Sequence, residues 1–117
     1  MGDRGGEKTV LNTNWEKNFG TDNHYVDYPV LSLELAQFLS NHPTLRGVGI
    51  ETNNCDVTGD ESYQIHKTLL GNNNKIIFEA LKNLAPLVGK KFLMVAPPLL
   101  VEGAEGGPCR AIALVHE

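Results

Sequence analysis

The stretch VLSLELAQFLSNHPTLRGVGIET (residues 30–52) decides the fold, because a helix, a short turn and a strand follow one another in it. Ser32 is suited to cap the helix, and residues 41–43, which include a proline, are suited to end it. The expected apolar face of the helix is formed by Leu35, Phe38 and Leu39. Residues 46–52 (RGVGIET) have the composition of a short buried strand between glycines. This order of elements is typical of an α/β fold.

The flanking segments extend the pattern. Residues 61–71 predict a second helix with Ile65 and Leu69 facing inward and Gly71 at its end. Further strands are predicted within residues 9–15, 75–81, 91–100 and 110–116. The sequence therefore predicts an α/β fold, with a small mixed sheet and two helices. The polar, glycine-rich residues 1–8 are expected to form a flexible N-terminus.

Composition and charge exclude several function classes. The formal net charge of the 117 residues is -4, whereas a nucleic-acid-binding surface would be basic. No apolar run approaches the roughly 20 residues of a membrane span, and the N-terminus lacks the apolar segment of a signal peptide. Cys55 and Cys109 have the spacing of neither a structural zinc site nor a disulfide framework, so we expect two reduced thiols. The chain is expected to be cytoplasmic, and to bind neither nucleic acid nor membranes.

His66 and Glu79, which flank a Gly-Asn-Asn-Asn turn, are candidate metal ligands. Glu79 directly follows the apolar residues 76–78, and a carboxylate there must be solvated, paired or metal-bound, because an unpaired buried charge is costly. Imidazole and carboxylate together suit zinc or manganese, but a catalytic zinc site takes three protein ligands. On these residues alone His66 is either a ligand or, as is commoner, a histidine at the boundary of the core.

Residues 15–30 have no regular period, and Trp15, Phe19 and Tyr25 lie in them among Gly, Asn, Asp and Pro. Aromatic-rich loops of this length are often functional. The alternative is a loop held in place by burial of Trp15 and Phe19.

Five short patterns in this chain follow the order found in the C-terminal half of one hydrolase family. They are Thr13-Asn14-Trp15, Pro29-Val30-Leu31-Ser32, Gly49-Ile50-Glu51-Thr52 with Asp56, His66-Lys67-Thr68-Leu69-Leu70 with Glu79, and Gly107-Pro108-Cys109-Arg110-Ala111. Together they resemble the cyclase family of metal-dependent hydrolases, which includes bacterial kynurenine formamidase and isatin hydrolase. Asn14 and Glu51 stand where that family usually has glycine and aspartate.

The resemblance implies a swivelling β/β/α fold in which residues 9–117 form a partial hydrolase domain. It implies that His66 and Glu79 bind a divalent metal, zinc or alternatively manganese, which lowers the pKa of a water molecule toward about 7. The implied reaction is hydrolysis of a small aromatic amide, such as N-formylkynurenine in tryptophan catabolism. Trp15, Phe19 and Tyr25 would contact this substrate, and no catalytic residue is assigned.

The family's His-x-Gly-Thr-His-x-Asp motif, which supplies most of its metal ligands, has no match in these residues. Whether the chain is an enzyme therefore stays open. The alternative is a truncated, catalytically inactive relative that does not retain the metal by itself. Such a relative would act as a binding or assembly module, either as a homo-oligomer or paired with a full-length copy.

Overall fold

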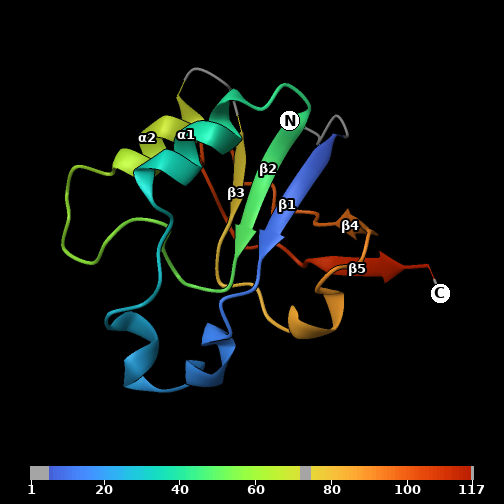
Figure 1. The fold of residues 1–117 in the computed structure, drawn as a ribbon, viewed down its shortest axis with the longest axis horizontal. Helices are drawn as coiled ribbons and strands as arrows, with labels where there is room; N and C mark the ends of the chain where they lie inside the picture. The colour runs from blue at the N-terminus through green and yellow to red at the C-terminus, as the bar shows by residue number, and fades with distance from the viewer. Residues whose placement is uncertain (1–5, 72–74, 117) are drawn as a thin grey trace. The chain divides into compact units, whose positions relative to one another are not determined.

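The structure is a computed structural model that describes residues 6–71 and 75–116 (Figure 1). The chain divides into two compact units, Met1–Ala85 and Pro86–Glu117. Of the N-terminus that was predicted to be flexible, residues 1–5 lie outside the described residues, and the first strand already begins at Glu7.

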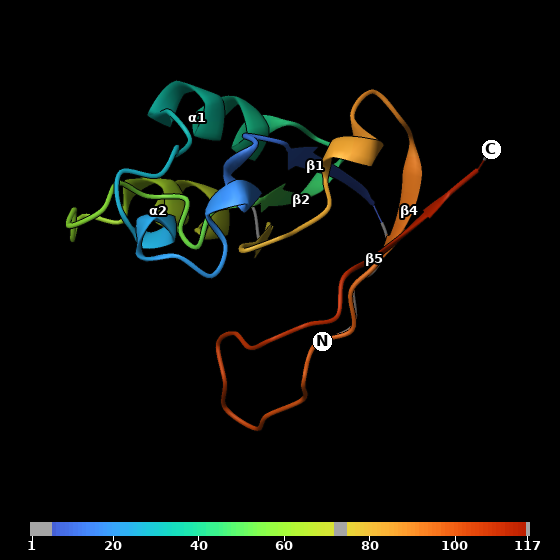
Figure 2. The same ribbon diagram turned by 90° about the horizontal axis from the view of Figure 1, so that it is seen from below.

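The first unit is built on a parallel sheet. Its strands β1 (Glu7–Leu11), β2 (Leu45–Ile50) and β3 (Ile76–Phe78) lie in the order β1-β2-β3, and their arrowheads point the same way in Figure 1. Helix α1 (Leu33–Asn41) lies between β1 and β2 in the chain, and α2 (Gln64–Leu70) between β2 and β3. Because parallel crossovers are right-handed, the two helices cover the same face of the sheet. They pack side by side there (Figures 1 and 2).

Short 3-10 segments occupy several of the connections: η1 (Trp15–Asn18), η2 (Asp22–Tyr25) and η3 (Ala85–Leu87). Neither α1 nor α2, the α-helices of the described residues, has the length and hydropathy to cross a membrane.

Helix α1 begins as predicted, because the Ser32 Oγ accepts a hydrogen bond of 3.1 Å from the backbone N–H of Leu35. Its buried side chains are Ala36, Leu39 and Ser40. Leu39 was thus predicted correctly, but Leu35 and Phe38 were not, since they are 36% and 66% exposed. The small Ala36 and Ser40 allow α2 to approach closely, and the Ser40 hydroxyl donates to the carbonyl of Thr68 on α2 at 2.8 Å.

The core of this unit lies between the helices and the sheet. It comprises Leu31, Ala36, Leu39, Leu45, Val48, Ile50, Cys55, Ile65 and Leu69. On the opposite face of β2, a Cβ atom at Gly49 would lie 2.7 Å from Leu81 Cδ1 and 3.2 Å from Val10 Cγ2. Glycine is therefore required there, because it lets neighbouring side chains close over the central strand.

The second unit contains an antiparallel pair, β4 (Phe92–Val95) and β5 (Ile112–Val115). The predicted strand of residues 91–100 is shortened to β4, as expected where Pro97 and Pro98 remove backbone donors. The predicted α/β class with two helices and small sheets is confirmed, and the parallel and antiparallel pairings belong to separate sheets.

Candidate metal centre

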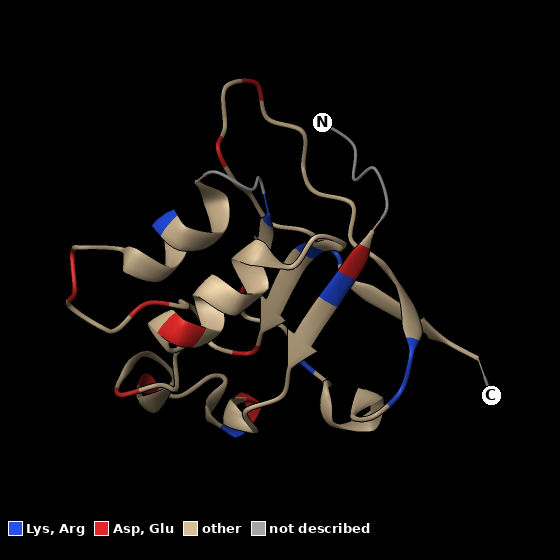
Figure 3. Ribbon diagram, turned by 45° about the horizontal axis from the view of Figure 1, so that its top comes forward, with Lys and Arg blue, Asp and Glu red and all other residues tan. Residues whose placement is uncertain are grey.

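Because β1, β2 and β3 are parallel, their C-terminal ends meet at one edge of the sheet (Figure 1). The segments that leave this edge are residues 12–16, 51–56 and 79–83. Ligands of open α/β sheets bind at such an edge. These three segments carry four acidic side chains and one lysine, so the edge favours a cation over an anion (Figure 3 draws acidic residues red and basic residues blue).

Glu51 fixes the loop after β1 onto the end of β2. Its fully buried carboxylate accepts a short hydrogen bond from the backbone N–H of Thr13, and others from the Thr13 hydroxyl (3.2 Å) and the N–H of Asn14 (2.9 Å). The second oxygen accepts from the N–H of Glu16 at 2.9 Å. Four donors therefore satisfy this buried charge.

Asp56 likewise fixes the start of α2 by accepting hydrogen bonds from its backbone. The N-cap residue of this helix provides no side-chain cap. The Asp56 Oδ1 accepts from the N–H of Ile65 at 2.8 Å, and its Oδ2 from the N–H of His66 at 3.1 Å. The same Oδ2 lies 2.7 Å from Nδ1 of the His66 ring. Because a carboxylate can only accept, the Nδ1 proton points to Asp56, and Nε2 is the ring nitrogen that would bind a metal.

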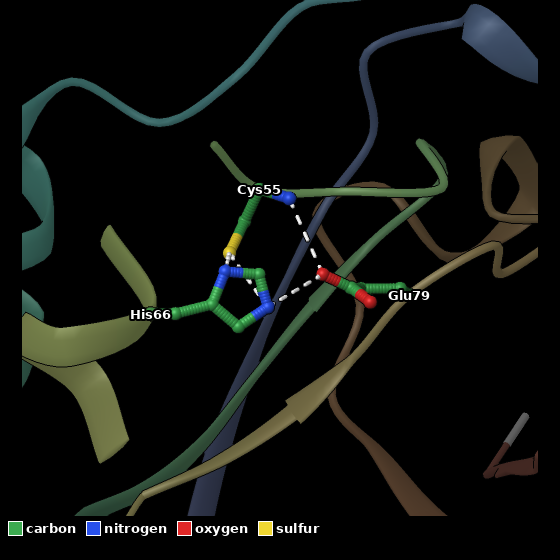
Figure 4. A group of neighbouring side chains, drawn as sticks. All are labelled: Cys55, His66 and Glu79. Carbon is green, nitrogen blue, oxygen red and sulfur yellow. Dashed lines mark hydrogen bonds and ion pairs between the residues drawn. The ribbon is translucent and has the colours of Figure 1, made fainter. Parts of the chain in front are cut away.

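His66, Glu79 and Cys55 form one cluster (Figure 4). The predicted pair is brought together, with His66 Nε2 3.2 Å from Glu79 Oε1. The Cys55 Sγ lies 3.4 Å from Nδ1 and 3.9 Å from Nε2 of His66, and the Cys55 N–H donates to Glu79 Oε1 at 3.3 Å. One potential ligand atom from each residue lies within 4.8 Å of the others. Nitrogen, oxygen and sulfur donors at this spacing fit a zinc-class divalent ion.

The environment changes the pKa of two groups in or beside the cluster. Burial, then the negative charges of Glu79 and Asp56, raise the pKa of the Cys55 thiol to about 12. Burial acts to raise the pKa of Asp56 as well, but the hydrogen bonds from Ile65 and His66 outweigh it, so this pKa is lowered. Without a bound cation the thiol is neutral and Asp56 is ionised at neutral pH.

The three predicted substrate-contacting residues all touch His24. The Trp15 Nε1 donates to the His24 carbonyl at 3.2 Å, the Phe19 ring stacks on the imidazole at a centroid distance of 4.3 Å, and the Tyr25 ring meets it edge-on at 4.9 Å. His24 is buried, and its Nδ1 has no hydrogen-bond partner among the described residues. Trp15 and Phe19 are half-buried, whereas Tyr25 is 61% exposed. These rings stabilise the loop, and Tyr25 is the most accessible to a ligand.

A shallow hollow of about 400 Å³ lies beside the cluster. It is lined by Val30, Leu31, Ser32, Leu33, Asp56, Val57, Asp60, Gln64 and Ile65. Asp56 thus faces the hollow as well as the imidazole, while the three cluster residues do not line it. The side-chain cluster, rather than this hollow, is the candidate functional site, because an imidazole, a carboxylate and a thiol converge there.

Comparisons with known proteins identify others that share the fold of this chain. No family model matches the chain. An uncharacterized protein of Methanocaldococcus jannaschii is 32% identical over 106 residues, which are 91% of this chain and 53% of that protein. A solved structure described as a potential metal-dependent hydrolase with cyclase activity has a TM-score of 0.64 and 22% identity, over 97% of this chain and 53% of its own.

A second solved structure, of a predicted metal-dependent hydrolase from Bacillus stearothermophilus, has a TM-score of 0.62 and 25% identity, over 80% of this chain and 46% of its own. The chain therefore spans about half the length of the proteins it matches, and shares their fold over that half. Both solved structures are described as metal-dependent hydrolases, and the likeness to them is one of fold. The assignments to kynurenine formamidase and to the C-terminal half stay predictions.

Proposed function

We propose that this chain provides a metal centre for amide hydrolysis, in which His66 and Glu79 bind a divalent metal, with zinc as the ion. One observation carries the proposal: His66 Nε2 lies 3.2 Å from Glu79 Oε1 at the strand-end edge of a fold shared with metal-dependent hydrolases. The imidazole faces a carboxylate at each ring nitrogen, Asp56 at Nδ1 and Glu79 at Nε2, and this concentration of acidic groups supports a cation site beside His66.

The neighbouring residues prepare both ligands. Asp56 keeps the proton on Nδ1 and orients the imidazole, and the Cys55 N–H holds the Glu79 carboxylate in place. When bound, the metal would supply Lewis-acid polarisation of a carbonyl group. The protein's own contribution is a ligand set fixed before the metal arrives.

The proposed substrate is a small aromatic amide of the kynurenine-formamidase type. Trp15, Phe19 and Tyr25 support it, because their loop leaves the same edge of the sheet as the metal cluster. The Trp15 Nε1 is already bonded to a backbone carbonyl, so Trp15 would offer its ring rather than a hydrogen bond.

Zinc titration by calorimetry tests the metal ligands. We expect the purified chain to bind zinc with a dissociation constant on the order of micromolar, since the imidazole and the carboxylate are already side by side. His66→Ala should abolish this binding, because it removes the ligand that both carboxylates face. Hydrolysis of N-formylkynurenine, assayed with and without zinc, then tests the substrate.

His116→Ala is the matched control, since His116 is exposed and lies in the second unit. It should leave zinc affinity unchanged. Zinc binding that survives His66→Ala, or that is lost equally in His116→Ala, would contradict the proposed centre.

A second candidate function, assembly, is favoured by the β4–β5 pair. Leu93 faces Leu114 and Val95 faces Ile112 across the two strands, and all four side chains are exposed. A two-stranded sheet is marginal alone, and an apolar patch of this kind marks an interaction site. A second copy of this chain is the partner we propose.

Sedimentation at increasing protein concentration tests this assembly. We expect reversible dimerisation, which Leu114→Lys should weaken at least tenfold, because an unpaired charge in an apolar contact is costly. Phe38→Lys on the exposed face of α1 is the control. A chain that stays monomeric, or a dimer indifferent to Leu114→Lys, would exclude this interface.

A further inference from the structure

Cys55 occupies a position unlike that of an ordinary core cysteine. It lies in the segment that follows β2 and is completely buried. A cysteine that only fills space contacts apolar groups, whereas the Cys55 Sγ lies 3.4 Å and 3.9 Å from the two ring nitrogens of His66. The sulfur therefore belongs to the polar cluster as well as to the hydrophobic core.

The distances around the cluster approach those between ligands of one tetrahedral ion. Zinc bonds of about 2.0 Å to nitrogen and oxygen and about 2.3 Å to sulfur place the ligand atoms about 3.3–3.5 Å apart. Here His66 Nε2 lies 3.2 Å from Glu79 Oε1 and 3.9 Å from Cys55 Sγ. The sulfur lies nearer Nδ1, at 3.4 Å, so binding of an ion at Nε2 would require the Cys55 side chain to shift toward Nε2 and Glu79.

The backbone around Cys55 holds the sulfur in this place. The Thr52 hydroxyl donates to the carbonyl of Asn54 at 2.9 Å, and the side chain of Asn54 accepts from the N–H of Asp56 at 2.8 Å. The Cys55 N–H itself donates to Glu79. A donor that is fixed in advance loses little conformational entropy when it binds a metal.

We propose that Cys55 is the third protein ligand of this centre, and that its sulfur makes the centre select thiophilic ions such as zinc and cobalt over manganese and magnesium. The inference rests on the proposed function, because it adds a ligand to the site of His66 and Glu79. It supplies the three protein ligands that an open zinc site takes, with the fourth position left for a substrate or water. Sulfur ligands favour zinc over the oxygen-preferring ions.

Cobalt(II) is the probe that reports sulfur ligation directly. We expect the cobalt-loaded chain to show a near-ultraviolet sulfur-to-cobalt charge-transfer band, which Cys55→Ser should remove. By competition, Cys55→Ser should weaken zinc binding about 10- to 100-fold and manganese binding much less, so the preference for zinc falls. Cys109→Ser, which alters the exposed cysteine, is the matched control and should change neither result.

Cys55→Val guards against loss of folding, because valine preserves an apolar side chain of similar size in the core. This variant should keep the thermal stability of the metal-free chain and still lose the band and the zinc preference. A band or zinc affinity that persists in both Cys55 variants would overturn the proposal and leave Cys55 as a core residue. Failure of the unaltered chain to bind any ion would instead overturn the proposed metal centre, and this inference with it.

Discussion

Glu51→Ala is expected to destabilise the chain by about 3–5 kcal/mol, enough to leave much of it unfolded. The substitution leaves four donors without their acceptor: the N–H groups of Thr13, Asn14 and Glu16 and the Thr13 hydroxyl. Each buried donor left unsatisfied costs about 1–3 kcal/mol, although those that reach water recover part of this. Urea unfolding followed by circular dichroism measures the loss.

Glu51→Gln should give an intermediate loss of about 2 kcal/mol, since the amide keeps one accepting oxygen but turns a donor toward a backbone N–H. Glu61→Gln removes an exposed carboxylate from the same unit and should change stability by less than about 0.5 kcal/mol. Equal effects of Glu51→Gln and Glu61→Gln would mean that the Glu51 carboxylate is not the anchor of the loop after β1.

Asp56→Asn is expected to reduce both stability and metal affinity. Its amide nitrogen would face either the N–H of Ile65 or the two donors of His66, so the start of α2 loses a cap worth about 1–2 kcal/mol. Because the imidazole also loses its orienting carboxylate, zinc affinity should fall about 10- to 100-fold. Asp60→Asn, at an exposed position in the adjoining turn, is the matched control.

The stabilisation from Asp56 should also depend on pH. Its pKa in the folded chain is lowered from the ordinary aspartate value of 3.8, so its contribution is complete above that value and is lost as pH falls through the folded-state pKa. The stability difference between the unaltered chain and Asp56→Asn, measured by urea unfolding in metal-free buffer, should therefore shrink in acid. A difference that stays constant from neutral pH to below 3.8 would contradict this role.

The elements of the fold could be predicted where local pattern determines them. The strand predicted over residues 46–52 overlaps most of β2 (Leu45–Ile50), and Ser32 caps α1, because both signals lie within a few residues of the element. The second helix begins at Gln64 rather than at residue 61, since Asp56 supplies its cap from the preceding loop. Capping rules consider only residues next to the start of a helix, so they do not predict this cap from Asp56.

Part of the candidate site could also be predicted from local sequence patterns. His66 and Glu79 were singled out as an imidazole and a carboxylate on either side of a turn. The packing of α2, which carries His66, against β3, which Glu79 follows, brings them together. Cys55 was predicted only as a reduced thiol, because Cys55 and Cys109 lack the spacing of a structural zinc site or a disulfide framework. The signal that could have identified it was its place in a polar loop after a buried strand, directly before Asp56.

The parallel sheet also has a consequence for how the first unit folds. Neither β1–β2 nor β2–β3 can form as a local hairpin, so the chain must close long loops before any strand pair is gained. Folding of such a topology is slow compared with that of a helical bundle. Cys55 follows β2, His66 lies in α2 and Glu79 follows β3, so these residues become neighbours only once β3 has paired with β2. A bound ion would therefore chiefly slow unfolding and have little effect on the rate of folding, because its site exists only in the folded structure.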